Sequence, residues 1–223
     1  EMTLLSEDME KGYPGKLSVK VVYTLGEDDS VKINYSATTD KTTIINLTNH
    51  AYFNLNNKVS NNILNHYLHI NADRIVACNE ALIPTGHIIS IKDTPLDFTH
   101  AQTIGSRITD SFPHHLFQGK GYVVSYVLNE PAQTLSLAAT VVAKESGRVM
   151  QVYTDQPGLQ FYSGWLFYGS DTGKNRQRYT NSSGLALEAQ GFPDAPNHPA
   201  FPSIVLQPDE VYRQTTVYRF LIE

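Results

Sequence analysis

The residues with the clearest chemical potential are one histidine and one glutamate that stand far apart in the chain. His50 lies in the middle of INLTNHAYFNL, an apolar and strand-like stretch at residues 45–55. Glu188 lies in GLALEAQGF, where strand alternation places it on one face with Ala186 and Gln190. A histidine held in a pocket and a partly buried carboxylate can transfer protons near neutral pH. The alternatives are a histidine satisfied within a turn and a glutamate on an ordinary solvated strand face.

Two glutamines are candidates for binding a polar ligand. Gln156 precedes the Pro-Gly turn in QPGLQFYSG, and Gln160 lies in the strand-like segment that follows this turn. A side-chain amide has both donors and acceptors, which suits the hydroxyl groups of a sugar. An exposed polar position without a ligand is the alternative for each residue.

The remaining histidines and the one cysteine do not form a recognisable metal or cofactor pattern. His66 and His69 are three apart in a strand-like segment, so they point to opposite faces, and His114 and His115 are adjacent in a loop-like segment. Cys78 has apolar neighbours, which is typical of a small core residue rather than a nucleophile. No glycine-rich phosphate loop, G-x-S-x-G or H-E-x-x-H motif occurs. The sequence therefore predicts no metal site and no cofactor.

The elements that must position these residues are predominantly β-strands. Apolar and polar residues alternate over 17–25 and 31–39 and again over 135–143 and 148–155, which predicts two β-hairpins. Further strands are expected within 159–166, 184–190, 203–208 and 211–220. The segment nearest to a helix is AQTIGSRI, residues 101–108, with two turns at most. The pattern predicts one all-β domain over residues 1–223, a mainly antiparallel β-sandwich.

The composition restricts the classes of partner. The chain has 41% hydrophobic and 17% charged residues, with a net charge of -5 and a pI of about 5.9. An acidic balance argues against nucleic acid or an anionic membrane as a partner. No apolar run approaches the roughly 20 residues of a membrane span, and a single cysteine permits no internal disulfide. A cytoplasmic location is the expectation.

Seven stretches, in order along the chain, resemble the aldose 1-epimerase (galactose mutarotase) family. They are GYPGKLSVKVVYTL (12–25), NLTNHAYFNL (46–55), ALIPTGHI (81–88), TPLDF (94–98), QPGLQFYSG (156–164), GLALEAQGFPDAPNHPAFPS (184–203) and LQPDEVYRQTTVYRF (206–220). The resemblance implies a large antiparallel β-sandwich, also called a supersandwich. It also implies interconversion of the α and β anomers of free hexoses such as galactose and glucose, without metal or cofactor.

By motif, the resemblance assigns roles to three residues. His50 matches the family's general acid, Glu188 its general base, and Gln160 a glutamine that contacts the sugar. The histidine would protonate the ring oxygen while the glutamate takes the proton of the anomeric hydroxyl, so that the ring opens and can close from the other face. This chemistry leads us to expect an acid and a base on opposite sides of one hemiacetal.

The chain departs from the family pattern at its start. Residues 1–16 resemble a segment well inside the family domain, so the chain resembles the C-terminal two-thirds of that domain. The family's preceding strands, with an Asn-Arg pair and a His-Gly-Gly motif that contact the sugar, have no counterpart here. We therefore expect unpaired sheet edges and an exposed core face. An N-terminal segment outside this chain, or a companion chain, would complete the domain.

A second departure lies in the stretch GYVVSYVL. The family has a Gly-aromatic-Asp-His run there, in which the Asp binds sugar hydroxyls, whereas Val123 stands at the Asp position and Val124 at the His position. Losing one buried hydrogen bond costs about 1–3 kcal/mol. Two alternatives follow: a catalytically impaired sugar-binding β-sandwich, or an epimerase of a phosphorylated hexose. The latter would need a basic cluster, and the densest one is Lys174, Arg176 and Arg178.

Overall fold

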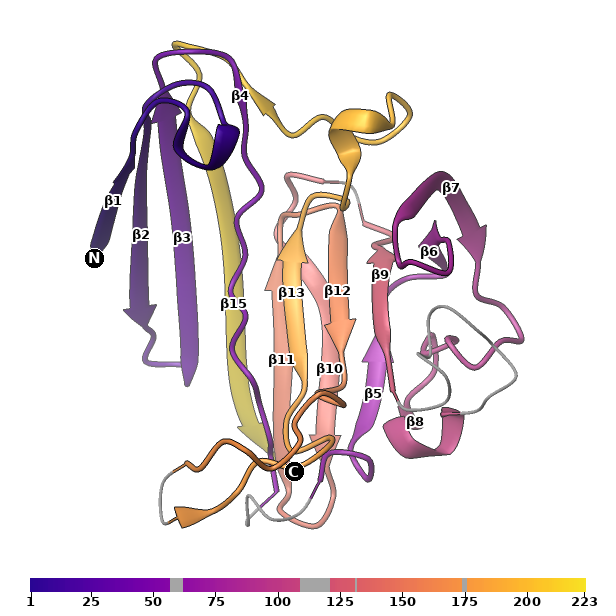
Figure 1. Cartoon of the computed structure of the whole chain (residues 1–223). Helices are drawn as coiled ribbons and strands as arrows, with labels where there is room; N and C mark the ends of the chain where they lie inside the picture. Colours follow the sequence, from indigo (N-terminus) through magenta and orange to yellow (C-terminus); the bar gives the residue numbers. More distant parts are fainter. Residues whose placement is uncertain (57–61, 109–120, 131, 174–175) are drawn as a thin grey trace.

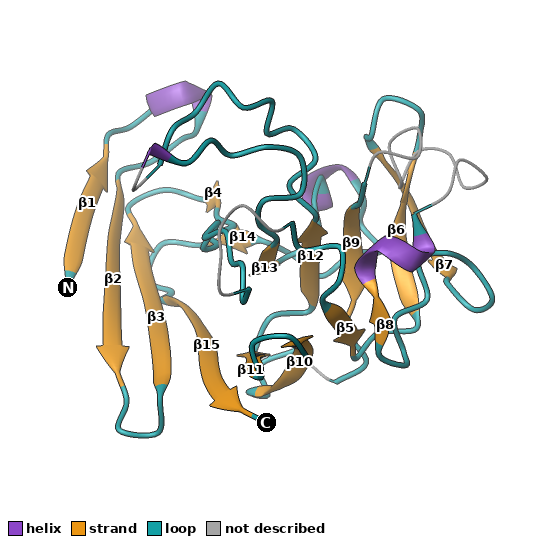
Figure 2. Ribbon diagram, turned by 90° about the horizontal axis from the view of Figure 1, so that it is seen from below, coloured by secondary structure: helices purple, strands orange, loops and turns teal. Residues whose placement is uncertain are grey.

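The computed structural model describes residues 1–56, 62–108, 121–130, 132–173 and 176–223, and it is built from antiparallel β-sheets (Figure 1). An eight-stranded sheet has the order β1-β2-β3-β15-β11-β10-β5-β8, and a five-stranded sheet has the order β13-β12-β9-β6-β7. A short pair, β14-β4, forms a third sheet. The two larger sheets pack face to face, which confirms the predicted all-β sandwich (Figure 2).

The strands of the large sheet are β1 (Met2–Ser6), β2 (Leu17–Leu25), β3 (Ser30–Thr39), β5 (Tyr67–Ile70), β8 (Gln102–Thr103), β10 (Ser136–Ala143), β11 (Arg148–Thr154) and β15 (Tyr212–Ile222). Those of the smaller sheet are β6 (Arg74–Cys78), β7 (Pro84–Ser90), β9 (Val123–Val127), β12 (Gly158–Tyr162) and β13 (Ala186–Gln190). The short pair is β4 (Thr43–Ile44) and β14 (Val205–Leu206). In the described part of the chain, the 3-10 helices are η1 (Glu10–Gly12), η2 (Ile104–Arg107) and η4 (Ala195–Asn197).

The two predicted hairpins are confirmed as β2–β3 and β10–β11. The segment AQTIGSRI contains the two-residue strand β8 and the four-residue helix η2, so it is less helical than its sequence suggests. The sequence did not predict β6, because Ile75 and Val76 are both fully buried although they point to opposite faces. A strand covered on both faces shows no alternation of apolar and polar residues.

The core lies between the two larger sheets, and this leaves the outer face of the smaller sheet free to carry polar residues. In β12, Leu159 and Phe161 are fully buried in the core, so Gln160 and Tyr162 point away from it. Phe161 packs against Tyr122 with ring centroids 5.2 Å apart. The same period of two operates in β13, where Leu187 faces the core.

One part of the large sheet extends past the smaller sheet. Strands β1, β2 and β3 lie beyond β13, the edge strand of the five-stranded sheet (Figures 1 and 2). The register places four apolar side chains of β1 and β2 on the same face as the core residues Ile33 and Tyr35. These four are largely exposed: Met2 56%, Leu4 65%, Tyr23 44% and Leu25 81%. We call this set the β1–β2 apolar face.

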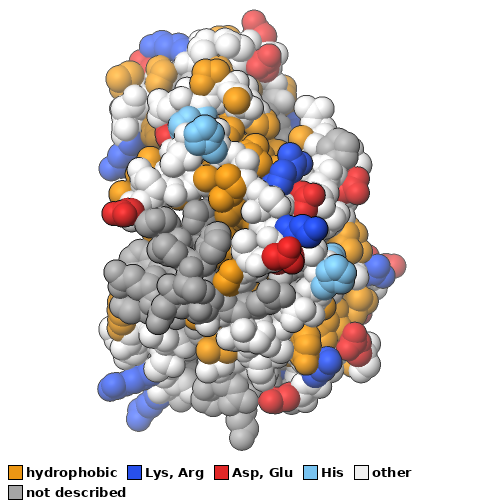
Figure 3. Space-filling view, turned by 90° about the vertical axis from the view of Figure 1, so that its right-hand side faces the viewer, with side chains coloured by type: hydrophobic (Ala, Val, Ile, Leu, Met, Phe, Trp, Pro, Cys, Tyr) orange, Lys and Arg blue, Asp and Glu red, His pale blue; other side chains and the backbone are white. Residues whose placement is uncertain are grey.

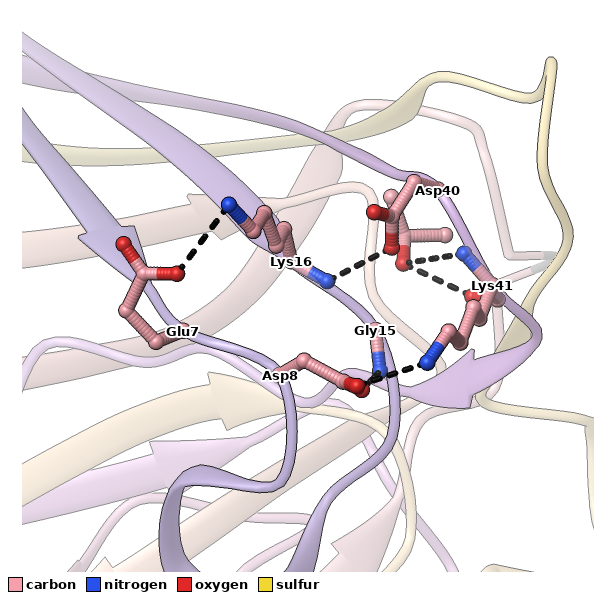
Figure 4. Close-up of polar contacts among 7 residues, drawn as sticks. Glu7, Asp8, Gly15, Lys16, Asp40 and Lys41 are labelled. Atoms are coloured by element: carbon pink, nitrogen blue, oxygen red, sulfur yellow. Dashed lines mark hydrogen bonds and ion pairs between the residues drawn. The ribbon is translucent and has the colours of Figure 1, made fainter.

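The turns around β1 and β2 are tied together by charged side chains (Figure 4). Asp8 accepts the backbone N–H of Gly15 at 2.7 Å and pairs with the Nζ of Lys41 at 2.6 Å. Asp40 accepts the backbone N–H of Lys16 at 2.7 Å. Hydrogen bonds from Lys41 and Gly15 lower the pKa of Asp8. The network fixes the turn before β2 against the turn after β3, and so orders the start of the sheet.

The surface shows no dominant charge on the face seen in Figure 3. Acidic and basic side chains of the described residues alternate there with apolar ones. Within the described ranges, no helix is long and apolar enough to cross a bilayer.

Candidate active site

Sheet register brings Glu188 and Gln160 together. In the ladder β9-β12-β13, Ser125 is opposite Gln160, and Gln160 is opposite Glu188. Side chains directly opposite each other in antiparallel strands lie on one face with Cβ atoms about 5 Å apart. Because Leu159 and Phe161 take the core face, this polar row points outward. Two of the three predicted site residues are therefore neighbours on adjacent strands.

His50 reaches this row through an extended segment that runs along the free edge of β13. Near one end, the side-chain amide of Asn46 donates to Gly191 O at 3.1 Å and accepts the Gly191 N–H at 2.8 Å. Near the other end, Phe53 and Leu185 exchange two backbone hydrogen bonds of 2.8 and 2.9 Å. Continued from the Phe53–Leu185 bridge, antiparallel pairing places His50 opposite Glu188. The contact of Asn46 with Gly191 holds the other end of the segment beside the same edge.

The histidine and the glutamate form a direct pair. His50 Nε2 lies 3.3 Å from Glu188 Oε1. The side chain of Glu188 is 10% exposed and that of His50 is 48% exposed. The carboxylate of Glu188 therefore lies deeper in the site than the imidazole of His50. Burial raises the pKa of Glu188, and the neighbouring His50 partly offsets this shift. A raised pKa strengthens the carboxylate as a proton acceptor.

The stretch around His50 is extended but is not a regular strand, and Asn49 explains why. Its Oδ1 accepts the backbone N–H of Ala51 at 3.1 Å, which is an Asx turn, and its Nδ2 donates to the hydroxyl of Tyr23 at 3.1 Å. This local turn orients the next residue toward β13. The His50 ring then packs 4.9 Å from the ring of Tyr52.

A cavity of about 650 Å³ surrounds the pair. His50, Glu188 and Gln160 all line it, and so does Val123. The other lining residues are Val76, Cys78, Leu82, Pro84, Ser125, Tyr162, Trp165, Leu166, Gln190 and Pro193. Its size is suited to a small ligand. The structure thus brings together the three site residues that the sequence indicated.

Gln156 is not part of this cavity. It lies before β12, its Nε2 donates to Asp155 Oδ1 at 3.1 Å, and it lines a different hollow beside β14. Of the two glutamines considered from the sequence, only Gln160 is placed to contact a ligand bound beside Glu188.

The remaining candidates are structural or lie outside the site. His66 is fully buried before β5, with its Nε2 3.0 Å from the Leu55 N–H and its Nδ1 3.0 Å from Asn65 Oδ1. Cys78 forms part of the cavity wall, where burial raises the pKa of its thiol. His114, His115 and Lys174 lie outside the described residues. Among the described residues, no group of three or more His, Cys, Asp or Glu side chains can hold a metal ion.

Ser125 is the site residue that the sequence analysis missed. It is 5% exposed, it lines the cavity, and its Oγ has no hydrogen-bond partner among the described residues. The signal was present in VVSYV, where Ser125 has the same strand parity as Val123. That parity is informative only once β9 is known to lie next to β12.

The free edge of β13 is held between its two ends by side chains from the large sheet. The hydroxyl of Tyr218 donates to Leu187 O at 3.1 Å, and Nε2 of Gln214 donates to Ala189 O at 2.9 Å. Both donors belong to β15 and are buried. These two carbonyls flank Glu188, so β15 supplies the hydrogen bonds that a neighbouring strand would otherwise make.

We expect Tyr218→Phe to loosen β13 selectively. Removing the hydroxyl leaves a buried carbonyl without its donor, at a cost of about 1–3 kcal/mol. Amide exchange measured over residues 184–191 should accelerate by about tenfold or more. Tyr126→Phe is the matched control, because its hydroxyl donates to Leu96 O at 2.9 Å in the core, away from β13. Equal exchange over 184–191 in the two variants would contradict this role of Tyr218.

Comparison with known proteins agrees with this architecture. The family model described as aldose 1-epimerase matches residues 1–219. Galactose mutarotase from Bos taurus is 40% identical over 222 residues, and aldose 1-epimerase from Escherichia coli K12 is 37% identical over 223 residues. The crystal structure of a GalM/aldose epimerase homologue from C. elegans superposes with a TM-score of 0.86 at 27% identity, covering 99% of this chain and 64% of that one.

The matches cover the present chain almost completely but the relatives only in part. They cover 100% of this chain and 63% of the Bos taurus protein, and 99% of this chain and 63% of the Escherichia coli protein. The chain thus spans less than two thirds of the length of these relatives. Its correspondence to the C-terminal part of the family domain stays a prediction. On the match of the family model and the identity to its members, the chain belongs to the aldose 1-epimerase family.

Proposed function

We propose that this chain carries the acid and base of an aldose 1-epimerase that interconverts the α and β anomers of a free hexose. Galactose and glucose are the first candidates, since relatives at about 40% identity bear the name galactose mutarotase. The observation that carries the proposal is the pair of His50 and Glu188, 3.3 Å apart in one cavity with Gln160.

In this mechanism His50 is the general acid and Glu188 the general base. The carboxylate accepts the proton of the anomeric hydroxyl while the imidazolium donates a proton to the ring oxygen. The bond between C1 and the ring oxygen breaks, and C1 becomes an aldehyde. Rotation about C1–C2 and ring closure with the two proton transfers reversed gives the other anomer. Each transfer can supply roughly 10²–10⁴-fold acceleration.

The placement of the two groups differs from the expectation of opposite sides. They lie side by side, and this suits the reaction because the ring oxygen and the anomeric oxygen are bonded to the same carbon. A single edge of the sugar can therefore face both side chains. Gln160, on the neighbouring strand, is within reach of an adjacent hydroxyl.

The lining of the cavity favours a neutral sugar over a phosphorylated one. Of the described residues that line it, none is a lysine or an arginine. Arg176 and Arg178 lie in the loop between β12 and β13 and are absent from this lining. A phosphate is normally bound by such cations or by helix N-termini.

A catalytically impaired sugar-binding protein is the second candidate, and Val123 is the observation that favours it. Its side chain lines the cavity but has no group that can bind a hydroxyl. Saturable sugar binding without any acceleration of anomerisation would select this candidate.

Polarimetry on freshly dissolved α-D-galactose and α-D-glucose tests the function directly. The protein in its full natural length should shorten the time to anomeric equilibrium in proportion to its concentration. A rate equal to that in buffer, with a folded protein, would exclude the enzymatic proposal for these sugars.

We also propose that strands from outside residues 1–223 cover the β1–β2 apolar face, either from a further segment or from a companion chain. Exposed contiguous apolar surface of this kind normally marks an interaction site. The exposed fractions of Leu4 and Leu25, 65% and 81%, are unusual for side chains on the core side of a sheet. The family domain would then be completed across this face. A single domain over 1–223 and a cytoplasmic location both stay predictions.

Dye binding tests the coverage of this face. Residues 1–223 alone should bind the hydrophobic dye ANS, and replacing Leu4 and Leu25 by serine should remove most of the fluorescence. The protein in its full natural length should bind little dye. Strong dye binding by the full-length protein that the same two substitutions abolish would show that the face remains uncovered.

A further inference from the structure

The cavity beside His50 and Glu188 has two chemically different sides. Toward β13 and β12 it presents the polar side chains of Glu188, Gln190 and Gln160. Toward β6 and β7 it presents apolar ones, namely Val76, Cys78, Leu82 and Pro84. The strand between them, β9, contributes one residue to each side.

Those two residues of β9 are Ser125 and Val123, two positions apart on the same face. Ser125 is in register with Gln160 and extends the polar row of Glu188 and Gln160 by one strand. Val123, in register with Tyr162, continues the apolar wall. The boundary between the polar and apolar sides therefore passes through β9.

The hydroxyl of Ser125 is enclosed at the cavity wall and is not satisfied by the protein. It is buried and lines the cavity, and no described residue supplies a partner for it. A buried hydroxyl without a hydrogen bond is unfavourable, so its presence needs an explanation. A rotation of the Ser125 side chain would turn this oxygen into the cavity, where a sugar hydroxyl bound beside Gln160 would satisfy it.

The apolar side imposes the opposite requirement on the ligand. A hydroxyl that is buried against Val123, Leu82 and Pro84 would lose its bonds to water and gain none in return. A C–H or methyl group at the same place would be favourable, because it removes apolar surface from water. A fully hydroxylated sugar can meet this wall only with the C–H groups of its ring, whereas a deoxygenated carbon has no hydroxyl to bury there.

We infer that the preferred substrate is a deoxy-aldose, bound with its deoxygenated edge against Val123 and its hydroxyls on Ser125, Gln160 and Glu188. This inference rests on the proposed function and specifies its substrate class. Ser125 and Val123 are then the residues that determine specificity. Ser125 forms a hydrogen bond with a sugar hydroxyl, and Val123 disfavours a hydroxyl at the position that it contacts.

Binding and anomerisation should both be measured on D-galactose, D-glucose and the 2-, 3-, 4- and 6-deoxy derivatives of each. Isothermal titration calorimetry gives the affinities, and polarimetry gives kcat/KM, both with the protein in its full natural length. At least one monodeoxy sugar should bind on the order of tenfold more tightly than its parent. Tighter binding of the parents than of every derivative would overturn the inference and leave the proposed function intact.

Two variants assign the preference to the named residues. Val123→Thr is nearly isosteric and adds a hydroxyl, so it should reduce or reverse the preference for the deoxy sugar. Val205→Thr, at an exposed position outside the cavity lining, is the matched control and should leave the preference unchanged. An unchanged preference in Val123→Thr would remove Val123 from the explanation and overturn the inference.

Ser125→Ala separates a ligand-binding hydroxyl from a structural one. Because no described residue bonds its Oγ, the free energy of unfolding should stay the same, while sugar affinity falls by about three- to tenfold. A less stable protein with unchanged affinity would show a structural role and contradict the assignment. If no sugar binds the native protein, the proposed function fails, and the inference fails with it.

Discussion

Glu188→Gln should abolish most of the proposed aldose 1-epimerase activity while leaving the fold at least as stable. The amide keeps the shape of the side chain and can still contact His50, but it cannot accept the proton of the anomeric hydroxyl. The loss in kcat should be on the order of 10²–10⁴-fold. Polarimetry at saturating sugar measures it, and sugar affinity should change far less than kcat.

The stability of the same variant provides an independent check on the burial of the Glu188 carboxylate. Burial raises the pKa of Glu188, which means that the charged carboxylate lowers the free energy of unfolding relative to the neutral form. A folded-state pKa above the unfolded value lowers stability as pH rises through it. At pH 8 the neutral amide should therefore unfold at the same or a higher denaturant concentration than the native protein.

Glu145→Gln is the matched control, because Glu145 is exposed in the turn between β10 and β11. It should change neither activity nor stability by a measurable amount. If Glu188→Gln retained activity close to that of the native protein, Glu188 would not be the base.

Acidification should destabilise the protein through His66, whose ring accepts a hydrogen bond from the end of the segment that carries His50. Burial lowers the pKa of His66 from 6.5 to about 4. In the folded protein Nε2 must stay unprotonated, because it accepts the N–H of Leu55, at the end of the segment that carries His50. Protonation turns Nε2 into a second N–H donor, so the buried hydrogen bond from the N–H of Leu55 is lost.

The sign follows from comparing the two states. Between pH 6.5 and about 4 the unfolded chain binds a proton that the folded protein excludes, so stability falls as pH decreases through this window. The shift corresponds to roughly 3 kcal/mol, on the scale of 1.36 kcal/mol per pKa unit. Burial also lowers the pKa of His69, which contributes in the same direction.

Urea unfolding at pH 7 and pH 4.5 measures this loss. His66→Gln should reduce the difference between the two pH values, because glutamine does not titrate there, although it should lower stability at pH 7. His87→Gln, at an exposed position in β7, should retain the full difference. An undiminished pH dependence in His66→Gln would show that other groups cause it.

The sequence was sufficient for features that depend on neighbours along the chain. The alternation in LSVKVVYTL and VKINYSATT was enough to predict β2 and β3, because a hairpin is a local structure with a period of two. His50, Glu188 and Gln160 could likewise be selected by residue type and by family resemblance. The strand β6 could not, because burial on both faces removes the alternation.

The tertiary structure decided which of these residues meet and what surrounds them. Glu188 and Gln160 are neighbours because of the register of β12 and β13, and His50 joins them because Asn46 and Phe53 bind the two ends of β13. Register between distant strands depends on long-range pairing and burial, which a local pattern does not contain.

The same reason explains why Ser125 and Gln214 were not identified beforehand. A serine between a valine and a tyrosine, and a glutamine between an arginine and a threonine, look ordinary in one dimension. Their importance arises because β9 lies beside β12, and because β15 lies close to the edge of β13 that bears Glu188. The sequence determined the chemical groups and the period of the strands, and only the packing of one sheet on the other determined the site that they form.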